Sequence, residues 1–206
     1  MKRETPKMPS LPGDLPVVVI VGRANVGKST LFNRLVRRRE AIVDDAPGIT
    51  RDRKAAEAEW QGRSFVLVDT GGYIPKGADS IEEGVSRQVR LAIEEAAVVV
   101  FVCDVTTGIT DVDAEIGRIL LRSGKPVIVV ANKTDHAGRL PDAAEFIRLG
   151  LGEAMPVSAA AGTSTGDLLA RVVESLGPET PAVPQAGTGA VVRLAVVGRP
   201  TVGKST

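Results

Sequence analysis

Short apolar runs, rich in β-branched residues, alternate along this chain with segments whose apolar residues recur at helical spacing. Such a run between turn residues is typical of a strand buried in a parallel sheet. The runs predict strands over residues 17–21, 96–103, 126–131 and 154–157. Two further runs, 54–60 and 64–68, are separated only by Gln61-Gly62-Arg63, which predicts a hairpin and therefore one antiparallel edge strand.

The segments between the strands carry apolar residues three and four positions apart, which is typical of amphipathic helices. This spacing predicts helices over residues 28–39, 81–93, 112–122, 142–149 and 168–176. Strands that alternate with helices in this way indicate an α/β fold with a mostly parallel sheet. In such a fold the carboxyl ends of the strands share one edge, where ligands bind.

The segment from Gly22 to Thr30 lies between the first predicted strand and the first helix, and it fits the phosphate-loop pattern. Its glycines allow turns that arrange backbone N–H groups around an anion, and the helix adds the positive end of its dipole. We expect Lys28 to contact the outer phosphates and Ser29 to bind Mg²⁺. The alternative is a glycine turn that binds nothing. The nucleotide-binding residues expected here are Gly22, Arg23, Asn25, Val26, Gly27, Lys28, Ser29 and Thr30.

Two later loops carry groups that suit the outer phosphates and the metal. Thr50 offers a second hydroxyl for Mg²⁺ and an N–H for a γ-phosphate, although an ordinary loop threonine is the alternative. Asp69 follows a predicted strand, so we expect its carboxylate to hold Mg²⁺, through water. Gly72 can donate its N–H to the γ-phosphate. An Asp-Thr-Gly-Gly turn is also common without any such function.

The segment Asn132-Lys133-Thr134-Asp135 follows another predicted strand. Guanine presents two adjacent donors that one carboxylate can accept, so Asp135 can distinguish guanine from adenine. We expect Asn132 to contact the base edge and the phosphate loop, and the stem of Lys133 to lie over the base. Ser158 and Ala159 are small enough to let a backbone N–H approach the guanine oxygen. The alternative for both segments is a polar turn after a strand.

Composition limits the possible functions. A net charge of +1 gives no global basic field for nucleic acid. Arg37-Arg38-Arg39 could form a local RNA contact, but cations at a helix C-terminus explain it more simply. The single cysteine, Cys103, is expected to be a buried thiol, which fits a reducing cytoplasm. The longest apolar run is too short to span a membrane, and the charged N-terminus is not a signal peptide.

The chain repeats its phosphate loop near its end. Gly198 to Thr206 matches seven of the nine positions of Gly22 to Thr30, 176 residues later. The proline- and glycine-rich segment before it has the composition of a linker. We therefore expect a disordered leader over residues 1–15, one domain over 16–177, a linker over 178–189 and the truncated start of a second domain over 190–206.

The order of these motifs resembles that of Ras-like GTPases, and the tandem phosphate loops resemble the EngA/Der family of bacterial GTPases, which have two consecutive GTPase domains. The segments 47–53 and 69–72 are particularly similar to that family. The resemblance implies a Ras-like P-loop three-layer fold with a six-stranded sheet, GTP hydrolysis with Mg²⁺, and a role in assembly of the 50S ribosomal subunit through the subunit or its rRNA. It also implies a second GTPase domain and a C-terminal domain in the full-length protein.

Three functional hypotheses follow. The leading one is a slow GTPase switch that binds GTP and GDP, with Lys28, Asn25, Thr50 and Gly72 as its catalytic residues. The second is a guanine-nucleotide sensor that docks on RNA or the ribosome with negligible hydrolysis. Tyr73 supports it, because Ras-like enzymes that orient water with glutamine carry that residue directly after the glycine. The third, an ATP-directed kinase or ATPase, shares the phosphate loop, but Asp135 argues against it.

The resemblance also generates a prediction about potassium. Asn25 matches a loop asparagine that in related GTPases helps to bind K⁺, an ion that supplies the positive charge otherwise given by an arginine finger. GTP hydrolysis should therefore be faster in potassium salts than in sodium salts. Single-turnover hydrolysis in the two salts tests this, and equal rates would contradict it.

Overall fold

The computed structural model describes residues 15–37, 54–71 and 89–178. Within these residues one six-stranded sheet has the order β2-β3-β1-β4-β5-β6. β2 pairs antiparallel with β3, and the other neighbours pair in parallel. The predicted α/β fold with one antiparallel edge strand is therefore confirmed. The strands are β1 (Val17–Val21), β2 (Lys54–Trp60), β3 (Arg63–Asp69), β4 (Val98–Asp104), β5 (Val127–Asn132) and β6 (Met155–Pro156).

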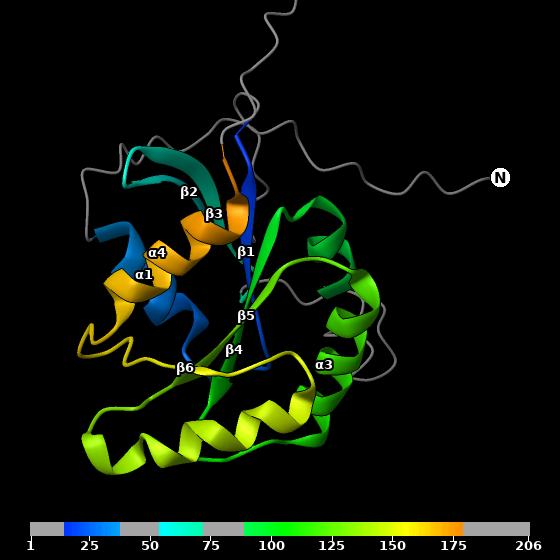
Figure 1. Ribbon diagram of the computed structural model, residues 1–206, viewed down its shortest axis with the longest axis vertical. Coiled ribbons are helices and arrows are strands. Elements are labelled where there is room, and N and C mark those ends of the chain that lie inside the picture. The colour runs from blue at the N-terminus through cyan, green and yellow to red at the C-terminus, as the bar shows by residue number, and fades with distance from the viewer. Residues whose placement is uncertain (1–14, 38–53, 72–88, 179–206) are drawn as a thin grey trace, which may run out of the picture.

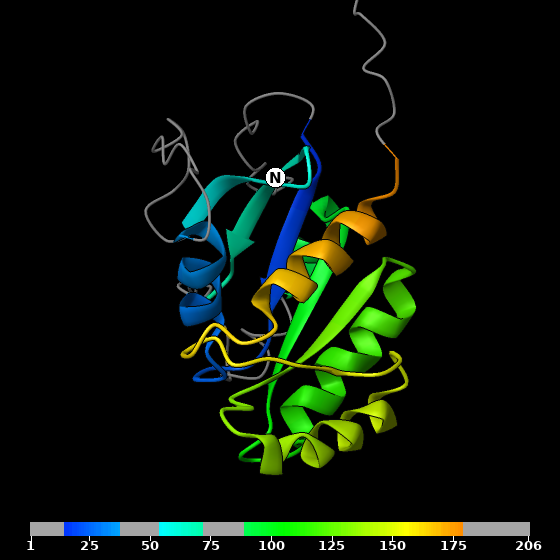
Figure 2. The same cartoon turned by 60° about the vertical axis from the view of Figure 1, so that its left-hand side comes forward.

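Helices cover both faces of the sheet, which gives three layers (Figures 1 and 2). α1 (Lys28–Arg37) and α4 (Thr165–Leu176) lie on one face, and α3 (Asp111–Ser123) lies on the other. Residues 89–95 form a helical segment on the α3 face, and the rest of the helix predicted over 81–93 lies outside the described residues. Two 3₁₀ segments, η1 (Ala137–Arg139) and η2 (Pro141–Leu149), follow β5.

The hairpin turn is shorter than the sequence pattern predicted. Trp60 pairs with Arg63, so Gln61 and Gly62 alone form the turn and Arg63 belongs to β3. The turn residues have φ values of 51° and 80°. Two positive φ angles characterise the two-residue turns whose twist matches that of the flanking strands. Because Arg63 is polar, the apolar pattern placed the start of the strand one residue too late.

Two elements near the end of the sheet also differ in detail from the prediction. The helix after Pro141 is of the 3₁₀ type, and its buried residues Ala143, Phe146 and Leu149 recur at every third position. That spacing matches the three residues per turn of a 3₁₀ helix. The predicted last strand shortens to β6, where Pro156 has no N–H to donate to the ladder.

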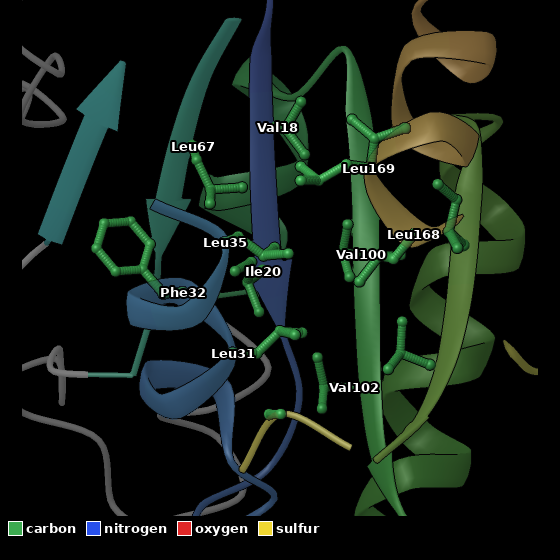
Figure 3. Packing of buried hydrophobic residues seen from close by; sticks show 14 of the residues in the cluster. Val18, Ile20, Leu31, Phe32, Leu35, Leu67, Val100, Val102, Leu168 and Leu169 are labelled. Atoms are coloured by element: carbon green, nitrogen blue, oxygen red, sulfur yellow. The ribbon is translucent and has the colours of Figure 1, made fainter. Parts of the chain in front are cut away.

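The central strands β1 and β4 are buried on both faces, which explains their uninterrupted apolar sequences. Along β1, Val18 belongs to the cluster under α1 and α4, whereas Val19 belongs to the cluster under α3. Figure 3 shows Leu31 and Leu35 of α1 beside Ile20 of β1. The phosphate-loop segment therefore leaves a strand and enters a helix that are both anchored in the same core.

Cys103 is fully buried in β4, as predicted. Burial raises the pKa of its thiol above the ordinary range, so the side chain is a neutral thiol of low reactivity. Within the described ranges, no helix is both long and apolar enough to cross a membrane.

The packing of β4 generates a stability prediction. Phe101 is 0% exposed, so Phe101→Ala should lower the free energy of unfolding by about 3–5 kcal/mol through lost burial and a residual cavity. Leu121 is 51% exposed, and Leu121→Ala should change that free energy by no more than about 0.5 kcal/mol. Urea denaturation followed by circular dichroism measures both. Similar losses in the two variants would contradict the described core.

Candidate functional site

The residues singled out in the sequence converge on one edge of the sheet. The phosphate loop follows β1, Asp69 ends β3, and Asn132 ends β5. These three strands run parallel, so their carboxyl ends face the same side. Ser158 and Ala159 join this edge through a hydrogen bond from the Ala159 N–H to Asn132 Oδ1. The edge therefore combines the loop, the acidic groups and the amide in one place.

The two glycines of the phosphate loop are required by close contacts as well as by their backbone angles. Gly22 has φ +147°, and a Cβ there would lie 2.3 Å from the carbonyl oxygen of Val102. Gly27 has φ +96°, and a Cβ there would lie 2.3 Å from Asn132 Nδ2. The loop is thus pressed against β4 on one side and against the Asn132 side chain on the other.

Lys28 is the first residue of α1, and its side chain folds back over the loop. Its Nζ donates to the carbonyl oxygens of Gly22, at 2.8 Å, and Arg23, at 2.6 Å. Burial lowers the pKa of this ammonium group, and the negative charge of Asp69 opposes that effect. The cation is held by neutral oxygens inside the loop, where an anion would be a stronger partner.

Ser29 and Asp69 form a cluster of oxygen donors. Ser29 Oγ donates to Asp69 Oδ2 at 2.6 Å, and the Gly71 N–H donates to Asp69 Oδ1 at 2.8 Å. A Cβ on Gly71 would lie 3.0 Å from Asp69 Oδ1 and 3.2 Å from Ser29 Oγ, so a side chain would crowd both groups. A hydroxyl beside a carboxylate is a donor set that suits Mg²⁺. In the described part of the chain, no three His, Cys, Asp or Glu residues cluster as a metal site.

The side-chain amide of Asn132 connects two loops. Its Nδ2 donates to the Val26 carbonyl oxygen at 2.8 Å, which is the contact with the phosphate loop expected from the sequence. Its Oδ1 accepts the Ala159 N–H at 3.0 Å. Any contact from this N–H to a guanine oxygen would have to share or replace that bond. Asn132 is 2% exposed, so both bonds are shielded from water.

The loop that contains Ser158 is held from two directions. Ser158 Oγ donates to Asp135 Oδ1 at 2.5 Å and accepts the Ala161 N–H at 3.0 Å. Arg34 of α1 donates through Nε to the Ala159 carbonyl oxygen at 3.1 Å and through Nη2 to the next carbonyl oxygen. Sequence reasoning missed Arg34, because nothing in its local pattern separates it from the other basic residues of α1.

Lys133 extends toward the phosphate loop, although its side chain is 38% exposed. Its Nζ donates to the Asn25 carbonyl oxygen at 3.0 Å and to Asp104 Oδ2 at 2.5 Å. Asn25 and Lys133 both have positive φ, 64° and 67°, which is uncommon for residues other than glycine. Sequence reasoning missed Asp104. Asp104 is an acidic residue at the carboxyl end of a parallel strand, and the same pattern led to the prediction of Asp69.

Arg23 directs its side chain away from the loop and toward α3. Its Nε lies 3.3 Å from Asp113 Oδ2, and its Nη2 donates to Thr107 Oγ1 at 2.5 Å. Asp113 also accepts the Thr110 N–H in a capping box at the start of α3. A role for Arg23 in holding nucleotide would therefore fall to its backbone. Asp113 could have been found from the Thr110-x-x-Asp113 capping pattern.

Some of the remaining predicted residues lie within the described part of the chain, and the others lie outside it. Val26 is fully buried and Thr30 is exposed at the start of α1. Outside the described residues lie Thr50, Gly72, Tyr73, Arg38, Arg39 and the second phosphate loop from Gly198 to Thr206.

Comparison with known proteins gives a family. The family model described as 50S ribosome-binding GTPase matches residues 17–133. The chain is 54% identical over 192 residues to GTPase Der of Symbiobacterium thermophilum and 51% identical over 195 residues to GTPase Der of Streptomyces coelicolor. These alignments cover 93% and 94% of this chain but 40% and 42% of the relatives. The chain thus spans about two fifths of the length of the curated relatives it matches.

Solved structures agree with a Ras-like P-loop fold. The chain resembles a crystal structure of a variant of Aquifex aeolicus Era bound to GDP·AlF4−, with a TM-score of 0.64 and 32% identity over 84% of this chain and 60% of Era. Era in complex with MgGDPNP and a segment of 16S ribosomal RNA gives a TM-score of 0.62 at the same identity and coverage. The G domain of the FeoB iron transporter of T. maritima gives 0.58 at 26% identity, over 78% of this chain and 98% of that domain.

The contact between the phosphate loop and Asn132 generates a prediction. Gly62→Ala and Gly27→Ala both place alanine at positive φ, but a Cβ meets no atom within 4 Å at position 62. Gly62→Ala should therefore cost only the backbone penalty of about 1–2 kcal/mol. Gly27→Ala should cost about 1–3 kcal/mol more, because the methyl group collides with the Asn132 amide. Urea denaturation without nucleotide measures both, and equal losses would contradict the close packing.

Proposed function

The chain belongs to the family of 50S ribosome-binding GTPases, and from that membership we propose that it binds GTP and GDP with Mg²⁺ and hydrolyses GTP as a conformational switch. One observation carries the proposal. Asn132 bonds the phosphate loop and the Ser158–Ala159 loop at the same time. Groups suited to phosphate and groups suited to guanine are thereby fixed along one edge of the sheet.

The phosphate end of the proposed site consists of the loop and the start of α1. The backbone N–H groups of residues 22–30 surround the phosphates, and the helix dipole adds positive potential. Lys28, held over the loop by two carbonyl oxygens, exchanges these neutral partners for the outer phosphates. That exchange is favourable because a charge-assisted hydrogen bond is stronger than a neutral one.

Ser29 and Asp69 hold the proposed Mg²⁺, Asp69 through water, and Thr50 is the proposed third ligand. Mg²⁺ supplies positive charge to the phosphate oxygens when it is bound. Ser29 donates to Asp69 in the structure, so this hydrogen bond would have to open for Ser29 to bind the ion. Asp69 is anchored by the Gly71 N–H, which keeps its second oxygen directed toward Ser29.

The base end consists of Asp135, Lys133 and the Ser158–Ala159 loop. Asp135 is exposed at the edge and held by Ser158 Oγ, so its carboxylate can accept the two donors of guanine. The Nζ of Lys133 is fixed near Asn25 by its hydrogen bond to the Asn25 carbonyl oxygen. Its aliphatic stem supplies an apolar wall for one face of the base.

For hydrolysis we propose that Lys28 and the N–H of Gly72 stabilise charge on the γ-phosphate, and that Thr50 and K⁺ near Asn25 complete the site. Asn25 is exposed on the loop, which supports a role for its side chain toward an ion. The proposed switch is ordering of the loops that carry Thr50 and Gly72 around the γ-phosphate and their release after hydrolysis.

The proposed partners are the 50S ribosomal subunit or its rRNA, in the cytoplasm. The family description, 50S ribosome-binding GTPase, supports a ribosomal partner. The role in assembly of the subunit is what the resemblance to the EngA/Der family implies. We also propose the domain organisation given above, with residues 16–177 as the first GTPase domain, 178–189 as a linker and 190–206 as the start of a second. The second GTPase domain and a C-terminal domain would belong to the longer protein.

The alternative of nucleotide sensing with negligible hydrolysis is supported by Tyr73, which cannot orient water as a glutamine amide does. Single-turnover hydrolysis with and without potassium separates the two functions. Release of phosphate from bound GTP supports the switch. Stable GTP under both conditions supports the sensor.

Guanine specificity is the first property to test. Unlabelled GTP and GDP should displace a fluorescent GDP from the chain in the presence of Mg²⁺, and ATP should not. Asp135→Asn should weaken GDP binding by about 10- to 100-fold, because it removes a charged acceptor of two hydrogen bonds. Asp142→Asn, at an exposed position in η2, removes the same charge and should leave binding unchanged. Equal competition by ATP would contradict the proposed function.

A further inference from the structure

Asp104 is a buried carboxylate at the functional edge that the proposed mechanism does not use. It ends β4, the strand between β1 and β5, and its side chain is 3% exposed. Oδ1 accepts the Thr106 N–H at 2.9 Å and the Thr106 hydroxyl at 2.7 Å. Oδ2 accepts Lys133 Nζ at 2.5 Å. Both oxygens are therefore held in fixed directions.

The charge of Asp104 is maintained by these contacts. Burial by itself raises the pKa of the carboxyl group, but hydrogen bonds from Lys133 and Thr106 outweigh it and lower the pKa below the ordinary value. The group is thus an anion at neutral pH, paired with a cation that is 38% exposed. A buried anion that lost this cation would be strongly destabilised, so the pair persists.

Lys133 carries the effect of Asp104 to the phosphate loop. Its Nζ is shared between Asp104 Oδ2 and the Asn25 carbonyl oxygen. A lysine side chain has a flexible four-carbon stem, and without a fixed partner its ammonium group extends into water. Asp104 and the Asn25 carbonyl oxygen together hold the ammonium group between the end of β4 and the phosphate loop, which limits the positions that the stem of Lys133 can take.

We infer that Asp104 is a positioning residue of the guanine-nucleotide site, which orients Lys133 as the wall for the base and as the tie to Asn25. This inference rests on the proposed function. Because the stem of Lys133 meets the face of the base and not its edge, Asp104 contributes to affinity but not to the choice between purines. In this respect Asp104 differs from Asp135, which is proposed to accept hydrogen bonds from the edge of guanine.

A double-mutant cycle tests the inference. Asp104→Asn keeps an oxygen acceptor for Thr106 but removes the charge that holds Lys133. Binding of fluorescent GDP should weaken about tenfold in this variant. Binding of inosine diphosphate, which lacks the 2-amino group, should weaken by the same factor. In a Lys133→Met background, Asp104→Asn should change GDP affinity by less than about twofold, because the group through which it acts is absent.

Asp111→Asn is the matched control. It removes the same charge from an exposed position at the start of α3, and GDP affinity should stay unchanged. Folding of every variant is checked by thermal denaturation without nucleotide. If Asp104→Asn does not fold, Asp104→Glu replaces it in the same cycle, because it keeps the charge but displaces the carboxylate by one methylene. It should weaken GDP binding with Lys133 present and have no effect in the Lys133→Met background.

Three results would overturn the inference. Asp104 variants that bind GDP like the wild type would show that Lys133 needs no such partner. Equal losses of affinity with and without Lys133 would show that Asp104 acts through the fold alone. Failure of the wild-type chain to bind any guanine nucleotide would overturn the proposed function and this inference with it, whereas the first two results overturn the inference alone.

Discussion

The buried amide of Asn132 is the interaction on which the rest of the site depends. It is 2% exposed, and its two ends bond the Val26 carbonyl oxygen and the Ala159 N–H. Either bond, if broken, would leave a polar group without water to replace the lost partner. The same amide excludes a side chain at Gly27, since a Cβ there would lie 2.3 Å from Nδ2. Gly27 and Asn132 therefore constrain each other, and together they fix the distance between the phosphate loop and the Ser158–Ala159 loop.

The cationic side chains in and next to the phosphate loop have different kinds of partner. Arg23 pairs with Asp113, and Lys133 pairs with Asp104. Lys28 instead donates to two carbonyl oxygens inside the loop. Two cations thus serve to brace the loop against β4 and α3, while the third is held by neutral partners. An anion that entered the loop would compete with these neutral acceptors for the hydrogen bonds of Lys28, and a charge-assisted hydrogen bond is the stronger of the two.

The strands and helices were predicted well where burial of one or both faces decides the pattern of apolar residues. β1 and β4 read as continuous apolar runs because both of their faces are covered, and α1 and α4 read as amphipathic because one face is covered. The predicted ends of the elements were less accurate. Arg63 belongs to β3 because Gln61 and Gly62 alone form the turn, which the apolar pattern does not indicate. Arg34 was missed because its role depends on a partner 125 residues away, which no local pattern contains. Asp104 carried a local signal, its place at the carboxyl end of β4, but the partner that gives it a role lies 29 residues away.

Two of the four residues other than glycine that have positive φ in the described part of the chain lie in or next to the phosphate loop. Asn25 and Lys133 both have positive φ, and Lys133 Nζ bonds the Asn25 carbonyl oxygen. Such conformations cost about 1–3 kcal/mol each, and they persist only where the surroundings fix them more than once. Here the ion pair with Asp104 fixes Lys133 from one side and the hydrogen bond to Asn25 fixes it from the other. Lys133 therefore connects the phosphate loop to the end of β4 through the two contacts of its ammonium group.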